Sequence, residues 1–154
     1  MEVPYVIKSD RWGGLGVFAA TDIKAGTKVW AFGKANVTVL DEDEAKAICT
    51  RQDPAALAHL LRMNYWIQPV DGGAPKMVDI RADDGRFFNH GVPPNVGPQS
   101  GSDDKFSTYA LVDIREGEEL VDDYRTYAEE PAWYSALLVE QGVDVSYIDT
   151  RAKA

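Results

Sequence analysis

Two short segments of the sequence carry side chains that could do chemistry together. The first covers residues 86–95 and places an asparagine next to a histidine, Asn89-His90, in a loop rich in proline and glycine. The second covers residues 116–124 and ends in two aspartates and a tyrosine. Amide, imidazole, carboxylate and phenol groups bind polar ligands, orient nucleophiles and move protons. We therefore expect the two segments to build one site.

A third segment, Trp12-Gly13-Gly14-Leu15-Gly16, lies near the N-terminus and is rich in glycine. Glycine lets the backbone approach a ligand closely or adopt a positive φ. Taken alone, this pattern is more typical of an ordinary turn. It is not a dinucleotide-binding fingerprint, because the third glycine and the following helix are missing. Trp12 fits a core position equally well.

Metal chemistry is not expected from this composition. An isolated asparagine-histidine pair is more often a turn asparagine beside a partly buried histidine. The only other histidine, His59, falls in a predicted helix, which makes a two-histidine metal site a poor interpretation of His90. Cys49 is the only cysteine, which excludes an internal disulfide and the usual cysteine-rich zinc site.

Taken in this order, the three segments resemble the signatures of SET-domain protein lysine methyltransferases. Residues 86–95 are similar to the RFxNHSxxPN signature of that family, and residues 116–124 to its GEELxxDY strand. Residues 12–19 are similar to its glycine-rich segment. The resemblance extends from about Tyr5 to Tyr127. Because the chain has a single cysteine, the resemblance is to the compact viral and bacterial members of the family, which lack cysteine-rich zinc modules.

The resemblance implies S-adenosylmethionine as methyl donor, S-adenosylhomocysteine as product, and no metal. It implies that the glycine-rich segment approaches the amino-acid end of the cofactor, and that Asn89 and His90 hold its methionine and adenine parts. Gly91-Val92 replaces the Ser-Cys that is usual in the family, which leaves the local packing open. The cofactor-binding residues implied are Trp12, Gly14, Leu15, Gly16, Tyr65, Arg86, Phe87, Asn89, His90, Tyr124 and Trp133.

Tyr124 is the expected catalytic residue. Methyl transfer from a sulfonium to an amine is an in-line displacement, so a protein mainly orients the reactants and preorganises the electrostatics. The nucleophile must be the neutral amine, although the pKa of lysine is about 10.4 in water. Burial in an apolar channel beside a positive charge lowers that pKa. The expected channel consists of Tyr65, Phe88, Asp122, Tyr124 and Tyr127, with Trp66 and Trp133 as further wall candidates or core residues.

Asp122 does not fit such a channel easily. Residues two apart in a strand share a face, so its carboxylate should lie on the side of Tyr124. A carboxylate there would favour the charged ammonium and oppose the nucleophile. Three interpretations stay open: the side chain is solvated, it faces elsewhere because the chain bends, or it orients the substrate amine.

Charge and composition limit the partners. The 154 residues have a formal net charge of −9 and a pI near 4.6, which argues against nucleic-acid binding and favours a basic protein or peptide, although acidity also serves solubility. No apolar run could cross a membrane and no signal peptide is visible. A cytoplasmic protein is expected, or a nuclear or chromatin-associated one if the source is eukaryotic or viral. Monomer and homodimer both stay open.

We therefore expect a methyltransferase that acts on the ε-amine of lysine in a protein, a substrate class that includes histones. The alternative is a non-catalytic SET-like protein-binding module. The acidic residues Asp83, Asp84, Asp103, Asp104 and Glu116–Glu119 could face a basic peptide, although such runs are more often solvated turns.

The pattern of short strands predicts a mainly β, α+β domain rather than alternating βαβ units. The resemblance implies a SET (β-clip) fold with short curved sheets, a pseudoknot-like chain crossing, a helical insert and a C-terminal helix. We expect a single domain over 1–154, with the insert and following strands at about 33–80 and the C-terminal helix and tail at 128–154. Expected strands cover 3–8, 17–20, 28–32, 65–70, 76–80, 106–114 and 119–124. The first three should form a meander, 65–70 should form a hairpin with 76–80, and 106–114 should pair with 119–124. Expected helices cover 41–48, 53–63 and 131–142.

Overall fold

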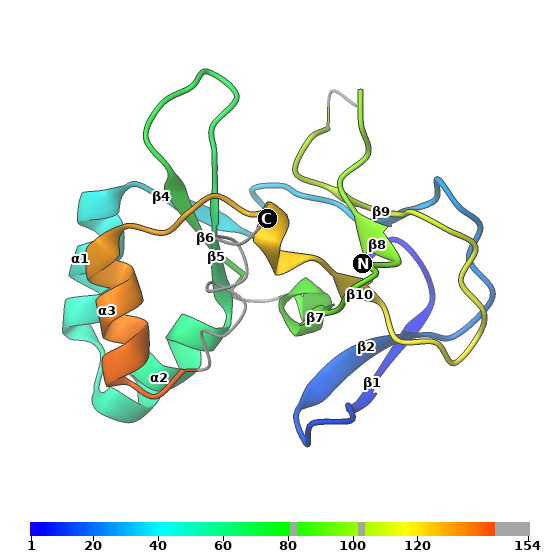
Figure 1. Ribbon diagram of the computed structural model, residues 1–154, viewed down its shortest axis with the longest axis horizontal. Helices are drawn as coiled ribbons and strands as arrows, with labels where there is room; N and C mark the ends of the chain where they lie inside the picture. Colours follow the sequence, from blue (N-terminus) through cyan, green and yellow to red (C-terminus); the bar gives the residue numbers. More distant parts are fainter. Residues whose placement is uncertain (81–82, 102–103, 144–154) are drawn as a thin grey trace. The chain divides into compact units, whose positions relative to one another are not determined.

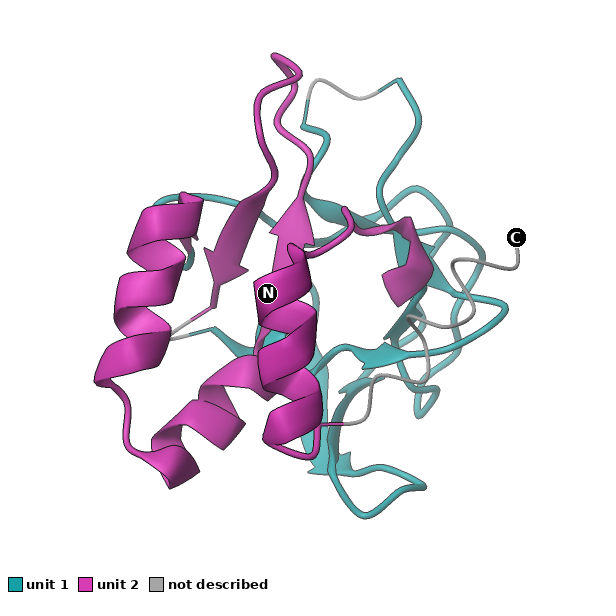
Figure 2. Cartoon of the chain, turned by 60° about the vertical axis from the view of Figure 1, so that its left-hand side comes forward, with its two compact units in different colours: residues 1–37, 81–123 teal, residues 38–80, 124–154 magenta. Residues whose placement is uncertain are grey.

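The computed structural model describes residues 1–80, 83–101 and 104–143, and it divides the chain into two compact units. Unit 1 combines residues 1–37 with 81–123, and unit 2 combines residues 38–80 with 124–154 (Figure 2). Each unit is therefore built from two stretches that are distant in sequence. Residues 144–154 of the expected C-terminal helix and tail lie outside the described part.

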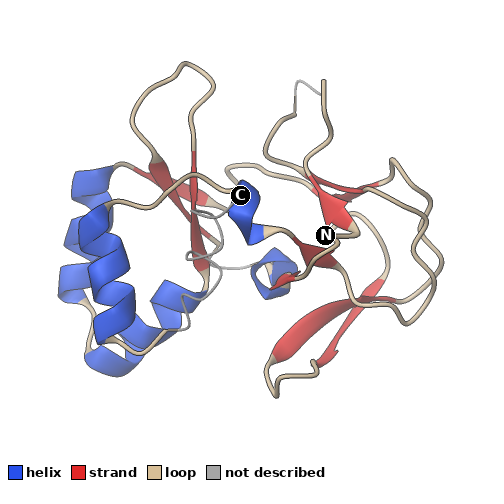
Figure 3. Ribbon diagram, in the orientation of Figure 1, coloured by secondary structure: helices blue, strands red, loops and turns tan. Residues whose placement is uncertain are grey.

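Unit 1 consists of small sheets around a core of apolar side chains such as Val17, Val29 and Leu120, each 0% exposed. Strands β1 and β2 form an antiparallel hairpin, β3, β9 and β8 form a second sheet, and β7 pairs with β10 in parallel (Figure 3). The elements are β1 (Tyr5–Ser9), β2 (Leu15–Ala19), β3 (Lys28–Trp30), the 3-10 helix η1 (Asp84–Phe87), β7 (Asn89–His90), β8 (Val96–Gly97), β9 (Thr108–Ala110) and β10 (Val121–Asp122).

Residues 89–97 pass along both edges of β10. On one edge, the amide of Gly91 donates to the carbonyl of Asp122 at 2.9 Å, continuing the β7–β10 pairing. On the other edge, the amide of Asn95 donates to the carbonyl of Val121 at 3.1 Å. The Asn95 side chain takes the place of a further strand residue, since its Oδ1 accepts from the amide of Val121 at 2.8 Å. This is the expected chain crossing.

Unit 2 has its three α-helices on one face of a three-stranded antiparallel sheet of order β4–β6–β5 (Figure 1). Leu40, Trp66 and Met77 from the strands pack with Ala45, Cys49, Leu57, Leu61, Tyr134 and Leu138 from the helices in one buried cluster. The elements are β4 (Thr38–Leu40), α1 (Glu42–Arg51), α2 (Pro54–Arg62), β5 (Asn64–Ile67), β6 (Lys76–Asp79), the 3-10 helix η2 (Tyr124–Thr126) and α3 (Ala132–Glu140).

Local sequence signals explain where these helices begin and end. Asp41 and Glu44 form a reciprocal capping box at the start of α1, with both hydrogen bonds at 2.9 Å. Helix α3 ends at Glu140 and is followed by Gly142, whose φ is +63°. The amides of Gly142 and Val143 donate to the carbonyls of Val139 and Leu138, which is the Schellman pattern. All three predicted helices are confirmed.

The predicted strand pairing is partly wrong. The opening segment is not a continuing meander, because β3 pairs with β9 rather than with β2. The predicted pair 106–114 and 119–124 does not form, since β9 joins β3 and β8 while β10 joins β7. Strands β4, β7 and β8 lie in segments where we expected no strand. The partners of β3 and β10 lie far away in sequence, where turn signals give no information.

The overall class is confirmed as a mainly β, α+β arrangement with three α-helices, the last one in the C-terminal part. The expectation that residues 1–154 make a single domain stays a prediction.

Candidate functional site

The side-chain amide of Asn89 brings the three predicted segments of unit 1 together. Its Nδ2 donates to the carbonyl of Leu15 at 3.1 Å and to Oε1 of Glu119 at 2.8 Å. It also lies 3.1 Å from Oδ2 of Asp10. Residues that are 74 positions apart, Leu15 and Asn89, therefore make direct contact.

The glycines beside Asn89 are needed for close packing. The positive φ in this segment belongs to Gly13, at +85°, and not to Gly14 or Gly16. A Cβ on Gly14 would lie 2.9 Å from Oδ2 of Asp10, and a Cβ on Gly16 would collide with Glu119 and meet Asn89 Nδ2 at 3.0 Å. The close approach that we expected from a ligand is thus made in this structure by the protein's own polar side chains.

The outer side of the glycine-rich segment is open to solvent. Trp12 is 59% exposed and Leu15 is 47% exposed, which excludes a core position for Trp12. The guanidinium of Arg11 lies 4.1 Å from the centre of a Trp12 ring. An exposed indole in this position is available to a ligand.

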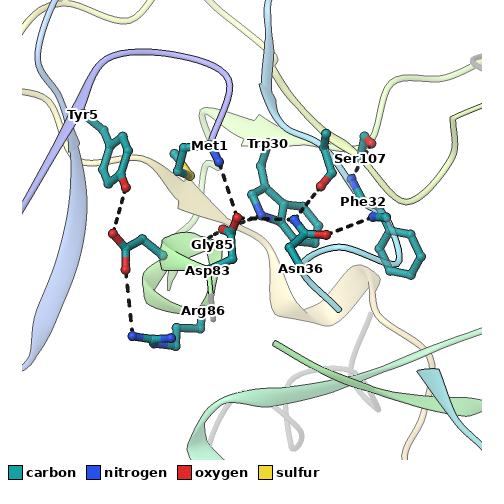
Figure 4. A network of polar contacts seen from close by, with 12 residues as sticks. Met1, Tyr5, Trp30, Phe32, Asn36, Asp83, Gly85, Arg86 and Ser107 are labelled. Atoms are coloured by element: carbon teal, nitrogen blue, oxygen red, sulfur yellow. Dashed lines mark hydrogen bonds and ion pairs between the residues drawn. The ribbon is translucent and has the colours of Figure 1, made fainter. Parts of the chain in front are cut away.

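Arg86 and Phe87 lie in η1, which a polar network centred on Asp83 holds in place (Figure 4). Asp83 Oδ1 accepts from the indole of Trp30 and from the amide of Gly85, both at 2.7 Å. A Cβ on Gly85 would collide with the Trp30 indole, so glycine is required there. Met1, Tyr5, Asn36 and Asp84 take part in the same network.

The electrostatics of this network favour the charged form of Asp83. Burial by itself would raise the pKa of Asp83, but hydrogen bonds from Gly85, Trp30 and Asn36 outweigh it and hold that pKa below the usual value. Tyr5 donates to Asp84 at 2.8 Å, and this bond raises the pKa of the Tyr5 phenol. The network therefore holds the Asp83 carboxylate in its charged form at neutral pH.

His90 follows Asn89 in β7 and is partly buried. Its Nδ1 lies 3.8 Å from Oδ1 of Asp123, at the end of β10. Phe88, the expected channel residue before the pair, is 7% exposed and follows η1 directly. The β7–β10 pairing thus fixes both residues of the Asn-His pair beside the second predicted segment.

Unit 2 contributes an aromatic stack that contains the expected catalytic residue. The rings of Tyr124 and Tyr127 are stacked, with centroids 5.3 Å apart and planes at 23°. Tyr127 in turn contacts Tyr65 of β5, with centroids 4.7 Å apart. The turn of η2 positions two of these rings, because the amide of Tyr127 donates to the carbonyl of Tyr124. Three of the five expected channel residues are therefore brought together.

Comparison with known families decides what these features belong to. The family model for the SET domain matches residues 14–125. The chain belongs to the SET-domain family. Comparison with curated proteins gave no match.

The structure explains one departure from the SET-domain signature. A Cβ on Gly91, where the signature has serine, would lie 2.7 Å from Cβ and Cγ2 of Val121. Gly91 and Val121 therefore fit each other across the chain crossing. Glycine in place of serine therefore packs without a gap or collision here, and the chain crossing is still formed.

The side chain of Asp122 is buried in this SET domain and has a hydrogen bond to the neighbouring backbone. It is 5% exposed, so the interpretation that it is solvated is wrong. Strand β10 ends at Asp122 and Tyr124 begins η2, so the alternation argument does not extend to Tyr124. The carboxylate lies beside Gly97 of β8, and its Oδ1 accepts from the amide of Asp123 at 2.7 Å. Its place in the substrate channel stays a prediction.

Trp133 lies on α3 and packs into the helical part of unit 2. Its ring contacts Trp66 at 6.3 Å and Tyr134 at 5.5 Å, and the Lys46 ammonium lies 5.5 Å from the ring centroid. It lines a shallow groove together with Cys49 and Leu57. Trp66 is 2% exposed and belongs to the core. A role of Trp133 in covering the cofactor stays a prediction.

Several of the described acidic residues have internal partners. Asp104 accepts from Lys28 and from Ser107, and both bonds lower the pKa of Asp104. Glu118 accepts from the amide of Arg115. As described above, Asp83 accepts from Trp30 and Gly85, and Glu119 accepts from Asn89. Asp103 lies outside the described residues. The hint of a basic peptide from these positions is therefore weaker than the sequence indicated.

Two residues of the site were missed in the sequence. Asp10 was not singled out, although an aspartate two to four residues before glycines is typical of a side-chain-capped turn. Glu119 was seen only as part of a charged turn, and no local signal points to its contact with Asn89.

Two wider properties complete the description. The described residues contain no group of three or more His, Cys, Asp or Glu side chains placed to hold a metal ion. Among the helices of residues 1–80, 83–101 and 104–143, none is long and apolar enough to cross a bilayer.

Proposed function

We propose that this SET-domain protein is an S-adenosylmethionine-dependent methyltransferase that acts on the ε-amine of lysine in a protein substrate. The observation that carries the proposal is the contact between Asn89 and the Leu15 carbonyl at 3.1 Å. It joins the asparagine of the Asn-His signature to the glycine-rich segment, and the family resemblance assigns both to the cofactor.

The residues around Asn89 suit the amino-acid end of this cofactor. The carbonyl oxygen of Leu15 and the amide oxygen of Asn89 are acceptors for an ammonium group. The exposed indole of Trp12 offers an apolar surface next to them. Bound S-adenosylmethionine would supply a methyl group activated by its sulfonium. The backbone of Gly14–Gly16, together with Asn89 and His90, would hold it.

The tyrosine stack suits the substrate amine. Aromatic rings exclude water, and a less hydrated environment favours the neutral form of a lysine amine. Phenol oxygens are acceptors that orient the amine or a polarised methyl group. Tyr124 is the proposed catalytic residue, and Tyr65 and Tyr127 are the proposed channel walls. The lysine proton leaves to water before the reaction, so no side chain has to act as a base.

The proposal is tested by transfer of labelled methyl groups to a panel of lysine-rich proteins, read by mass spectrometry, with cofactor binding measured in parallel by calorimetry. We expect Tyr124→Phe to lower the transfer rate by about 100-fold or more while cofactor affinity changes little. Tyr127→Phe is the matched control, because it removes a hydroxyl from the same stack. We expect a much smaller loss for it.

The outcomes separate two functions. Lysine methylation that depends on Tyr124 would support the proposal that the protein is a lysine methyltransferase. Cofactor binding without transfer to any protein of the panel would favour the non-catalytic SET-like binding module. Absence of cofactor binding in the wild-type protein would contradict the proposal.

A further inference from the structure

We infer that Asp10 is a positioning residue, which fixes the direction of the Asn89 amide so that its oxygen faces the α-ammonium of the cofactor. This inference rests on the proposed function. It adds a residue outside the matched range 14–125 to the cofactor site.

The Asp10 carboxylate is itself held in one orientation by the backbone. Its Oδ1 accepts from the amides of Trp12 and Gly14, both at 2.8 Å. The amide of Asp10 donates to the carbonyl of Gly14 at 3.1 Å, which closes the turn around Gly13. With Oδ1 committed to the turn, Oδ2 is the oxygen that faces Asn89, at 3.1 Å.

Asn89 is surrounded by acceptors on one side only. Its Nδ2 faces three oxygens, from Asp10, Leu15 and Glu119, although an amide nitrogen has only two hydrogens to donate. The planar amide group therefore points Oδ1 away from these oxygens. Within the described residues, no donor contacts that Oδ1. An outward-facing acceptor with two carboxylates behind it matches an ammonium and disfavours a carboxylate.

The carboxylates of Asp10 and Glu119 contact the same nitrogen of Asn89 but differ in how freely they can rotate. Asn95 holds the backbone carbonyl of Glu119, but within the described part no second hydrogen bond holds its carboxylate, so a glutamine there could rotate and offer its side-chain oxygen to Asn89. An asparagine at position 10 could not do so, because the amides of Trp12 and Gly14 require its oxygen. Its NH2 group would then face the NH2 group of Asn89, and two donors cannot form a hydrogen bond with each other. The Asn89 amide would therefore rotate by half a turn and present its oxygen to position 10.

This difference gives a matched pair of variants, Asp10→Asn and Glu119→Gln, which remove the same charge beside the same atom. Binding is measured by calorimetry with S-adenosylhomocysteine and with 5′-methylthioadenosine, which lacks the amino-acid part. We expect Asp10→Asn to weaken S-adenosylhomocysteine binding about tenfold, the loss of one hydrogen bond to a charged group. We expect Glu119→Gln to stay within about twofold, and 5′-methylthioadenosine to bind both variants nearly as it binds the wild type.

Retained 5′-methylthioadenosine binding also shows that the variants are folded. A third variant, Asp10→Ser, keeps an oxygen for the turn and brings no NH2 group to Asn89. We expect it to bind S-adenosylhomocysteine more tightly than Asp10→Asn does. The side-chain NH2 resonances of Asn89 provide a readout without ligand, and they should shift more in Asp10→Asn than in Glu119→Gln.

Equal weakening by Asp10→Asn and Glu119→Gln would show that charge, and not direction, matters, and would overturn the inference. Equal loss of both ligands in Asp10→Asn would overturn it as well. If the wild-type protein binds neither ligand, the proposed function fails. If the wild type binds S-adenosylhomocysteine and Asp10→Asn binds it as tightly, only the role of Asp10 fails.

Discussion

The amide of Asn89 in unit 1 is held by directed hydrogen bonds to Asp10, Leu15 and Glu119, whereas the ring of Tyr124 in unit 2 is held by stacking on Tyr127. A hydrogen bond depends on which atom is the donor and where it points. Stacking and core packing depend on shape and volume. A change that keeps the shape but reverses a donor should therefore harm unit 1, and a change that keeps apolar volume should be tolerated by unit 2.

Removal of volume from unit 2 should have the largest effect on stability. Leu138 is 2% exposed on α3 and belongs to the buried cluster. We expect Leu138→Ala to lower the free energy of unfolding by about 3 kcal/mol, because it loses buried apolar surface and leaves a cavity. Chemical denaturation measures this loss.

Leu138→Met is the control for that experiment. It keeps the volume and should cost less than about 1.5 kcal/mol. A methionine variant as unstable as the alanine variant would show that unit 2 depends on detailed fit, and the contrast between the units would fail.

Restoration of the serine of the SET-domain signature should destabilise the chain crossing of unit 1. We expect Gly91→Ser to cost about 2 kcal/mol, since its Cβ would lie 2.7 Å from Val121. Val121→Ala removes Cγ2 but keeps Cβ, so it should relieve part of that collision. The double variant should thus be more stable than the sum of the single losses by about 1 kcal/mol, measured as a double-mutant cycle from unfolding curves. Strict additivity would mean that the two residues are not coupled.

An isosteric change in the Asp83 network should have a smaller effect that depends on pH. We expect Asp83→Asn to cost about 1.5 kcal/mol at pH 7, because it weakens hydrogen bonds from Trp30, Gly85 and Asn36 to a charged group. The folded-state pKa of Asp83 is lowered, so its contribution is complete above the unfolded value of about 3.9. It is lost as the pH falls through the folded pKa.

The stability difference between wild type and Asp83→Asn should therefore be constant from pH 7 to about 5 and narrow below about 4. Unfolding curves at several pH values measure it. Asp113→Asn removes an exposed carboxylate paired with Lys24 and serves as the control, for which we expect a smaller change. A difference that stays constant down to pH 2 would show that the charge of Asp83 contributes nothing.

The smallest effect concerns reactivity rather than stability. Cys49 is 6% exposed, and burial raises the pKa of its thiol. Since the thiolate is the nucleophile, we expect alkylation by iodoacetamide at pH 8 to be several-fold slower in the folded protein than in urea. Mass spectrometry follows the single modification. Equal rates in both conditions would mean that the core around Cys49 is more open than the structure shows.

Local signals account for the parts of the fold that the sequence predicted well. The capping box of Asp41 and the glycine after α3 are each decided within a few residues, and both were placed correctly. The partners of β3 and β10 were not predicted. These pairings join segments about 80 and 30 residues apart, and an alternating pattern fixes the faces of a strand but not its neighbour.

The candidate site divides in the same way. Asn89, His90 and Tyr124 were predicted through the resemblance of whole motifs, and Tyr65 and Tyr127 as aromatic residues that suit the channel of that family. Asp10 and Glu119 could not be predicted, because they belong to the site only through hydrogen bonds from Asn89, which lies 79 and 30 positions away in the sequence. Asp122 shows the limit of the strand argument, since β10 ends there and the alternation stops with it.

The two-stretch construction of unit 1 has a consequence for how the protein is made. Residues that meet at Asn89 come from positions 10, 15, 89 and 119, and the crossing needs β10 between residues 89–91 and Asn95. A ribosome delivers these residues in order, so the Asn89 environment cannot close until the chain has been synthesised beyond residue 122. Contacts of such long sequence separation also slow folding, because the loop between them must close first. The 38–80 stretch of unit 2, with helices α1 and α2 and three antiparallel strands, can therefore begin to form during synthesis, before the Asn89 environment of unit 1 is complete.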